Sequence, residues 1–474
     1  MLLAFALIGA ACGNDDAADV QPSPGDTSEA TTETDAGDTD DGEATDDGEA
    51  TDDGEAADGE GSDDGEAADA GETDDGEATD DGEAADAGET DDGEAADDGE
   101  GSDEGTELSG DPVLIGFVGT SILAGQASFD AMVNGLEAAT IAINNDGGID
   151  GRPIEVLICD DLGDPNLAVE CAQQHIDAGV STFVANFTPF GDAVNPIIGE
   201  AGYVIIGGGL YTPGDFGVEF LYSTNGGAFT AGAGGPVACI IVGGSRLAYA
   251  YNDIPAGAQV PPLVEAMVTG PRDGVDLIHT EPIGFAQADF APSAAKIIGA
   301  DPDCITAGVN LPQVPPLIQA LRDQGYDGQI QIPGDFNAAE AVIEALGDAA
   351  NNVVLADIYD QTSPGYAEYV AAVAETTGDD SPPLPLGVMG WLGLRVAADV
   401  IRAAGDDPAA IAAAVPEVVV DYDTGGLTAT PLDWSVPGVN PLGITNLRDV
   451  SVMAREIVDG EIVYFGEWEP IFVG

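Results

Sequence analysis

The sequence predicts an α/β protein with two doubly wound parallel-sheet lobes, preceded by a long disordered acidic linker. From residue 113 onward, apolar runs of strand length alternate with helical patterns, which is typical of βαβ units and a parallel sheet. The composition of the 474 residues also divides in two. Residues 13–110 hold 41 of the 89 acidic residues and none of the nine Lys and Arg, which leaves 111–474 with a net charge of −39.

The acidic segment, residues 13–110, is predicted to stay unfolded. Its apolar residues are almost all Ala, and burying Ala cannot offset the entropy lost on ordering the chain. The unit Thr-Asp-Asp-Gly-Glu-Ala, found for example at Thr45, recurs with neither an apolar coiled-coil seam nor the ligand spacing of an EF-hand loop. We expect a solvated tether; a neutral flexible chain of this length spans roughly 55 Å, and self-repulsion extends it.

The first residues, MLLAFALIGAA, precede Cys12 and resemble the end of a bacterial lipoprotein signal peptide. The resemblance implies a signal over 1–12 and a lipid on Cys12. Gly9 stands where Leu is usual, and the cationic start of such signals is missing. The alternative is a short disordered N-terminus with an incidental cysteine.

The charge pattern excludes several classes of function. Binding to nucleic acid or to an anionic membrane surface needs a basic face, and the nine scattered cations include only one lysine, Lys296. No apolar run reaches the 18 residues that a membrane-spanning helix needs. An acidic folded part suggests a saline environment, where salt screens self-repulsion.

The predicted elements follow one another in a regular order. In the first half, strands are expected at 113–118, 154–158, 182–185 and 203–206, and helices at 129–144, 165–178 and 191–201. The pattern then restarts, with strands at 246–251, 275–280, 304–309, 329–332, 353–356 and 462–465. Helices are expected at 229–242, 261–268, 291–298, 315–324, 338–346, 365–376, 387–404 and 408–415. Ligands bind beyond the carboxyl ends of such strands.

The order of several motifs resembles periplasmic binding proteins of the branched-chain amino acid type, the receptors of ABC importers. The motifs are Ile115-Gly-Phe-Val, Asn134-Gly-Leu-Glu-Ala, Gly147-Gly-Ile-Asp-Gly-Arg-Pro-Ile-Glu155, Asp160-Asp-Leu-Gly-Asp-Pro165, Tyr251-Asn-Asp-Ile-Pro-Ala-Gly257 and Gln324-Gly-Tyr-Asp-Gly328. The resemblance covers about 113–470 and implies the type I periplasmic binding protein fold.

This resemblance also implies a domain plan. The N-terminal lobe would comprise 111–224 plus 358–440, and the C-terminal lobe 225–357 plus 441–474. Three hinge crossovers, near Ser223, 357–360 and 434–446, would join them and let the lobes close on a ligand.

By the same resemblance, ligand contacts come from the loops that follow the strands. The implied residues are Thr120, Ser121, Phe187, Thr188, Gly208, Gly209, Tyr211 and Asp335. Thr188 would donate to a ligand carboxylate, the amides of Gly208 and Gly209 would face an anion, and Asp335 would take an ammonium group.

Departures from the family leave alternatives open. Tyr211 replaces the usual Thr, and Ala256 replaces an aromatic residue, so the pocket is expected to be wider than one fitted to leucine. Thr188 and Asp335 also suit helix caps, and Tyr211 suits packing at the rim. Asp160 and Asp161 are interpreted as turn residues.

Four cysteines remain after Cys12, an even number for an exported chain. Cys159 ends a strand and Cys171 lies in the helix that follows, so a bridge between them is reasonable. We favour the pairs Cys159–Cys171 and Cys239–Cys304; four buried free thiols are the alternative.

The sequence shows no catalytic set. His175 is expected on a helix surface and His279 in a strand, and there is no nucleophile elbow, P-loop or metalloprotease motif. No cofactor or metal is predicted. We expect a monomeric extracytoplasmic lipoprotein that delivers an amino acid or amide to ABC permease subunits and touches the membrane only through its lipid. A ligand sensor without transport and an amide hydrolase are the alternatives.

Overall fold

The computed structural model describes residues 108–121, 126–254, 257–334 and 337–473. The signal-like segment, Cys12 and the acidic repeats lie outside these residues, and so does Asp335.

The first sheet has five parallel strands in the order β2-β1-β3-β4-β5. They are β1 (Val113–Gly119), β2 (Ile154–Asp160), β3 (Thr182–Val184), β4 (Ile205–Ile206) and β5 (Leu221–Tyr222). Chain order reverses at β1, which lies between β2 and β3, and ligand sites in open α/β sheets form beyond such a switch point. β5 was not predicted, because two residues carry no periodicity.

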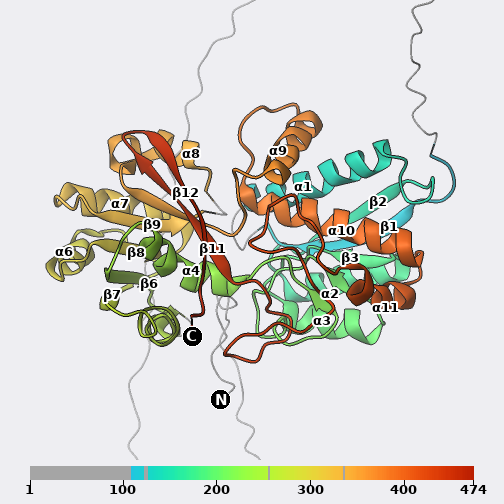
Figure 1. The fold of residues 1–474 in the computed structure, drawn as a ribbon, viewed down its shortest axis with the longest axis horizontal. Helices are drawn as coiled ribbons and strands as arrows, with labels where there is room; N and C mark the ends of the chain where they lie inside the picture. The colour runs from blue at the N-terminus through green and yellow to red at the C-terminus, as the bar shows by residue number, and fades with distance from the viewer. Residues whose placement is uncertain (1–107, 122–125, 255–256, 335–336, 474) are drawn as a thin grey trace, which may run out of the picture. The chain divides into compact units, whose positions relative to one another are not determined.

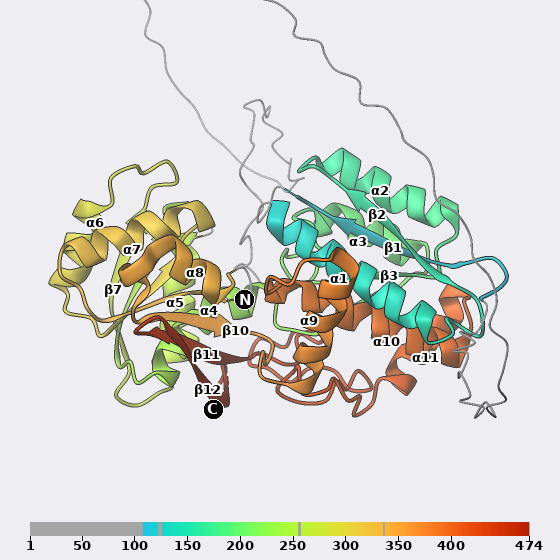
Figure 2. The same cartoon turned by 90° about the horizontal axis from the view of Figure 1, so that it is seen from above.

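Helices cover this sheet and form the first lobe with it. They are α1 (Gln126–Asn145), α2 (Pro165–Ala178), α3 (Gly191–Glu200), α9 (Pro364–Thr377), α10 (Val388–Ala404) and α11 (Pro408–Val418). α1 packs against α9 and α10 (Figure 2). A Cβ at Gly135 of α1 would overlap the carbonyl oxygen of Gly387, so this close approach requires glycine. Asp164 caps α2 by accepting from the Asn166 amide, and Pro165 takes the first helical position, as the sequence predicts.

The second sheet has seven strands in the order β12-β11-β10-β9-β8-β6-β7 (Figure 1). They are β6 (Arg246–Asn252), β7 (Asp276–Ile283), β8 (Cys304–Gly308), β9 (Gln329–Pro333), β10 (Val353–Asp357), β11 (Ser451–Val458) and β12 (Glu461–Pro470). β11 is antiparallel to both β10 and β12. The predicted parallel-sheet lobes are confirmed, and the second sheet ends in an antiparallel hairpin, of which the sequence analysis missed β11.

This sheet and its helices form the second lobe. The helices are α4 (Ala228–Ile241), α5 (Val260–Val264), α6 (Ala291–Gly299), α7 (Val314–Asp323) and α8 (Ala339–Leu346). The single helix expected at 261–268 is α5 followed by a π-helical turn, Glu265–Thr269. Short 3-10 turns occur at Gly257–Gln259, Leu311–Gln313, Gly347–Ala350 and Pro385–Gly387.

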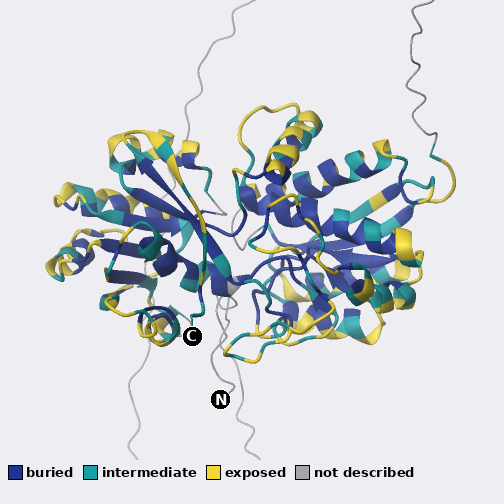
Figure 3. Ribbon diagram, in the orientation of Figure 1, coloured by how far each residue is buried: buried dark blue, intermediate teal, exposed yellow. Residues whose placement is uncertain are grey.

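The chain passes between the two sheets at three places: from β5 to α4, from β10 to α9, and from the segment after α11 to β11. Hydrogen bonds tie the first two passages together. The Tyr359 hydroxyl lies 3.1 Å from Thr224 Oγ1 and accepts from Asn225 Nδ2 at 2.9 Å. Figure 3 shows that the central strands of both sheets are buried. Among the described residues, no helix has the length and apolar character needed to cross a membrane.

Candidate functional site

The carboxyl ends of the first-sheet strands bring three loops together. The Phe187 amide donates to Val118 O at 2.9 Å, and the Thr120 amide donates to Phe187 O at 3.0 Å. The Gly209 amide donates to Asn186 O at 3.1 Å, which adds the loop after β4. These loops carry every predicted ligand contact of the first lobe: Thr120, Ser121, Phe187, Thr188, Gly208, Gly209 and Tyr211.

Thr188, which the sequence suggests as a donor to a ligand carboxylate, donates its hydroxyl proton to Asp161. Thr188 Oγ1 lies 2.5 Å from Asp161 Oδ2 and accepts from the Phe190 amide at 3.2 Å. The hydroxyl therefore braces the loop that leads into α3, which is close to the capping role left open above. A hydroxyl has one proton and two lone pairs, so Thr188 keeps one acceptor position and no proton for a ligand.

Asp161 is fully buried at the centre of this edge. Burial raises the pKa of its carboxyl group, while hydrogen bonds from Thr188, the Gly163 amide and Thr120 act to lower it. The Gly163 amide lies 2.9 Å from Asp161 Oδ1. The Gly163 bond makes Asp161 a turn residue, as the sequence suggested. Its bond with Thr188 was not foreseen, because one acid among 89 carries almost no signal in the sequence.

Asp160 also acts as a turn residue. Its Oδ1 accepts from the Leu162 amide at 2.9 Å and from the Ser121 amide at 3.0 Å. Asp160 thereby joins the loop after β2 to the loop after β1. The side chain of Ser121 is half-buried at the end of the described part of that loop.

Asn186 is a functional candidate that the sequence analysis did not single out. Its Oδ1 accepts from the Val118 amide at 3.0 Å, and only 7% of the residue is exposed. Its Nδ2 is buried and has no hydrogen-bond partner. Buried polar groups are nearly always paired, so an orphan donor at a ligand-binding edge needs an explanation. The preceding residue, Ala185, has a left-handed φ of 55°, which turns the chain sharply after β3.

Tyr211 packs inside the lobe rather than at the rim. Its ring meets Phe187 edge to face, with centroids 4.8 Å apart, and both residues are buried. The Tyr211 amide donates to Asp215 Oδ2 at 3.0 Å. Asp215 also accepts from Thr212 and Asn195, and burial raises the pKa of its carboxyl group. This aromatic pair forms an apolar wall beside the polar loops.

At the carboxyl edge of the second sheet, amide side chains link the loops after β6 and β8. Asn252 Nδ2 lies 2.7 Å from Gln313 Oε1 and 3.2 Å from Asn310 Oδ1, and the Asn310 amide donates back to Asn252 Oδ1 at 2.9 Å. Sequence reasoning pointed to these loops but not to these residues. Asp335, the predicted ammonium partner, stays a prediction because it lies outside the described residues.

His175 does not lie on the helix surface, as the sequence suggested. It is 5% exposed, and its Nε2 lies 3.1 Å from Phe117 O beneath β1. Burial lowers the pKa of the imidazole. In the part of the chain that the structure describes, no group of three or more His, Cys, Asp or Glu residues could hold a metal ion.

A buried ion pair lies where the chain leaves β10. Arg455 of β11 binds Asp357 through two hydrogen bonds, of 2.6 and 2.8 Å, and both side chains are 3% exposed. Burial alone would lower the pKa of Arg455, but the paired carboxylate holds it above its usual value. The pair joins β11 to the start of the second passage between the sheets.

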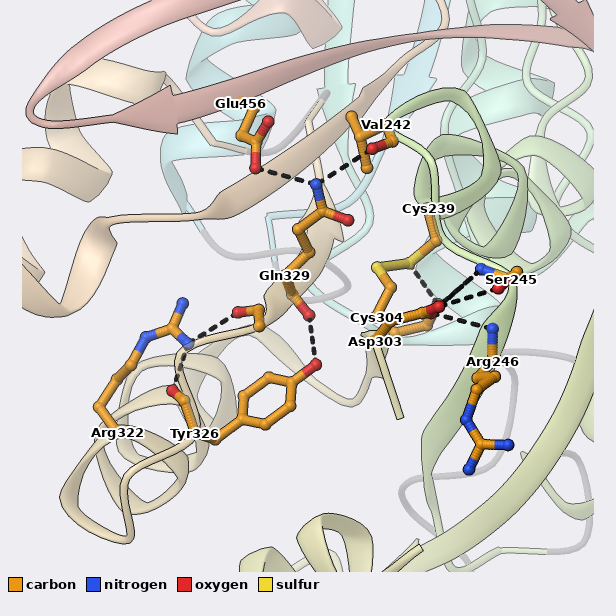
Figure 4. Close-up of a disulfide and its surroundings, with 12 residues drawn as sticks. Cys239, Val242, Ser245, Arg246, Asp303, Cys304, Arg322, Tyr326, Gln329 and Glu456 are labelled. Atoms are coloured by element: carbon orange, nitrogen blue, oxygen red, sulfur yellow. Dashed lines mark hydrogen bonds between the residues drawn. A yellow bond between two sulfur atoms is a disulfide. The ribbon is translucent and has the colours of Figure 1, made fainter. Parts of the chain in front are cut away.

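Both disulfides form in the pairing favoured by the sequence. Cys159–Cys171 joins the end of β2 to α2, with the Cα atoms 5.7 Å apart. Cys239–Cys304 joins α4 to β8, with the Cα atoms 5.8 Å apart. Figure 4 shows the second bridge beside Gln329, which donates to Val242 O and Glu456, and beside Asp303, which accepts from Ser245 and Arg246.

Comparison with known proteins agrees with this architecture. The family model described as "Periplasmic binding protein" matches residues 112–434. Leu/Ile/Val-binding protein homolog 2 of Brucella abortus (strain 2308) is 23% identical over 316 residues, which is 64% of this chain and 82% of that protein. The match to homolog 1 of the same strain, at 24% identity, spans 51% of this chain and 66% of the relative.

Two solved structures share the fold. The leucine-binding protein LivK of Thermotoga maritima is 18% identical with a TM-score of 0.57, covering 76% of this chain and 99% of its own. A solute-binding protein of an ABC transporter from R. palustris, in complex with 4-hydroxybenzoate, is 18% identical with a TM-score of 0.58, covering 76% of this chain and 97% of its own. The chain belongs to the periplasmic binding protein family of non-enzymatic binding proteins.

Proposed function

We propose that this protein is the extracytoplasmic substrate-binding component of an ABC importer and captures an amino acid or a related small polar ligand by closure of its two lobes. The observation that carries the proposal is the convergence of polar groups at the carboxyl edges of both sheets, next to an apolar wall in the first lobe. A ligand that touches both edges would stabilise the closed state.

The names of the relatives support a small organic ligand, because they include Leu/Ile/Val-binding proteins and a 4-hydroxybenzoate complex. The predicted partner is an ABC permease, and a lipid on Cys12 would hold the chain outside the cell. Of the implied contacts, Thr120, Ser121, Phe187, Gly208, Tyr211 and Asp335 keep their proposed role. The Gly209 amide already donates to Asn186 O, so it does not face an anion as expected. Thr188 changes from donor to acceptor.

Ligand binding is tested by thermal unfolding and calorimetry of the full-length chain with amino acids, short amides, aromatic acids, urea, polyamines and sugars. A ligand at a thousandfold excess over Kd stabilises the folded state by about 4 kcal/mol, so a tight ligand is readily seen. Asp335→Ala should abolish the shift with an amino acid if Asp335 takes the ammonium group. The absence of a shift with every class would contradict the receptor function.

Lobe closure needs its own measurement. With a saturating ligand, the radius of gyration from small-angle scattering should fall, because a hinged pair of lobes becomes more compact on closing. An unchanged scattering curve with ligand bound would leave binding intact and exclude closure as its mechanism.

A further inference from the structure

We propose that Asn186 is a ligand-contacting residue that donates to a ligand carbonyl oxygen and, together with the acceptor at Thr188, favours a small primary carboxamide over a carboxylate. This inference rests on the proposed function, since it specifies the chemistry that the first lobe presents to its ligand. Three observations carry it: the orphan amide nitrogen of Asn186, the hydrogen bonds that occupy the neighbouring threonine, and the positions of the basic residues.

The orientation of the Asn186 side chain is unambiguous. Its Oδ1 accepts from the Val118 amide at 3.0 Å, and a flipped carboxamide would bring two donors together there. The backbone oxygen of Asn186 is held by the Gly209 amide at 3.1 Å, so the residue is fixed on both sides. The remaining group, Nδ2, is a two-proton donor that is buried, 7% exposed as a residue, and without a partner. A ligand oxygen would complete its hydrogen bonding.

The hydroxyl of Thr188, two residues further along the same loop, offers a ligand an acceptor instead of a donor. Thr188 gives its proton to Asp161 at 2.5 Å and can only accept from a ligand. The loop thus offers a donor at Asn186 and an acceptor at Thr188. A primary carboxamide carries a carbonyl oxygen for the first and an N–H group for the second, whereas a carboxylate has no proton to give.

The distribution of charge also disfavours an anion. Asp161 is fully buried at this edge, and Asp160 lies beside it at the end of β2. All nine basic residues of the chain lie within the described ranges. Seven are in ion pairs: Arg152, Arg246, Arg272, Lys296, Arg395, Arg402 and Arg455. Arg322 binds backbone carbonyls. Arg448 donates to Val436 O through Nε and stacks on Tyr222, while its Nη1 is buried without a partner. A ligand carboxylate at the loops after β1, β2 and β3 would therefore lie beside Asp160 and Asp161, and in the described part of these loops no ion pair or hydrogen bond involves a basic residue.

The test measures affinity by calorimetry on the full-length chain with three matched pairs: isobutyramide and isobutyrate, benzamide and benzoate, and leucinamide and leucine. We expect the amide of at least one pair to bind at least about tenfold more tightly than its acid. Asn186→Asp keeps the oxygen that Val118 needs and replaces the donor by an acceptor. It should weaken amide binding by about tenfold or more, the size expected when a buried donor is lost.

Asn144→Asp is the matched control. Asn144 also uses both ends of its carboxamide, on the amide and carbonyl of Ile154, but it does so at the amino end of β2. This control should bind like the parent protein. If Asn186→Asp fails to fold, the Asn186 side-chain amide resonances of the parent protein, observed by NMR, should shift on ligand saturation.

The outcomes separate the two proposals. If the parent chain binds a ligand and Asn186→Asp binds it equally well, or the Asn186 amide resonances do not move, the role of Asn186 is wrong and the receptor function stands. The same holds if the acids bind more tightly than their amides. If no amide, acid, amino acid or sugar binds, the receptor function itself fails, and the role of Asn186 fails with it.

Discussion

At the scale of single residues, the site is organised around one buried acid. Asp161 accepts hydrogen bonds from the Thr188 hydroxyl and the Gly163 amide, and these bonds determine which donors and acceptors the loops still offer a ligand. Neither hydroxyl nor acid is unusual in the sequence. Asp161 follows β2 and Thr188 follows β3, so only the folded chain brings the acid and the hydroxyl together.

The raised pKa of Asp161 predicts a pH dependence of stability. A carboxyl group whose pKa is higher in the folded than in the unfolded protein contributes stability below its unfolded pKa, and that contribution is lost as pH rises through the folded pKa. The unfolding free energy of the parent protein should therefore fall relative to that of Asp161→Asn as pH rises from about 4 to 7. Urea titrations of both proteins at several pH values would measure this difference. A constant difference would contradict the raised pKa.

The ion pair between Asp357 and Arg455 predicts a second, larger effect. Arg455→Met leaves the Asp357 carboxylate buried without its partner, and breaking such a pair costs about 3–5 kcal/mol. The double variant Asp357→Leu with Arg455→Met removes both charges and should recover most of that loss. Chemical denaturation of the three variants tests this. Equal losses in the single and double variants would show that packing, rather than the unpaired charge, sets the cost.

At the scale of helices and strands, periodicity was a good guide where an element is apolar and regular. The strands β1, β6 and β8 were predicted within two residues at each end, because each is a buried apolar run between turn signals. β11 was missed because Arg455 and Glu456 interrupt its apolar pattern, and both are buried. One signal was available: Asp459-Gly460, both with positive φ, is the two-residue turn that favours a hairpin.

The candidate site was harder to predict than the fold. The loops could be identified, because ligands of open α/β sheets bind at strand carboxyl ends. The function of Asn186 could not, since an orphan donor is defined by which hydrogen bonds its neighbours make. The role of Thr188 was likewise left between donor and cap, and the hydrogen bond to Asp161 decides against the donor.

The two disulfides predict unequal contributions to stability. Cys239–Cys304 closes a loop with a sequence separation of 65, and Cys159–Cys171 one of 12. Loop-closure entropy then gives about 4 kcal/mol for the first and about 3 kcal/mol for the second. In thermal unfolding, the double variant Cys239→Ala with Cys304→Ala should show a larger fall in Tm than the double variant Cys159→Ala with Cys171→Ala. The reverse order would mean that local packing outweighs the entropy of the unfolded chain.

At the scale of the whole molecule, charge dominates. Residues 111–474 carry a net charge of −39, and seven of the nine cations are already paired with acids. Repulsion among these acids weakens the compact state. Salt screens the repulsion between charges that are farther apart than about 10 Å at 0.1 M salt, or about 3 Å at 1 M.

Salt should therefore stabilise the protein. Tm is expected to rise steadily between 0.1 and 1 M NaCl, and equally in KCl, because screening depends on ionic strength rather than on the cation. Differential scanning calorimetry in both salts measures this. A flat Tm would show that the acids are too far apart in the folded state to repel one another.

The bridge between Cys159 and Cys171 has one further consequence. Cys159 immediately precedes Asp160 and Asp161, and Cys171 is fully buried in α2. The acidic loop at the centre of the site is thus anchored covalently at its base before any ligand arrives. A ligand that docks there meets a preorganised surface and spends little of its affinity on ordering it. Reduction of this bond would release that loop at its base, so ligand recognition should weaken together with stability.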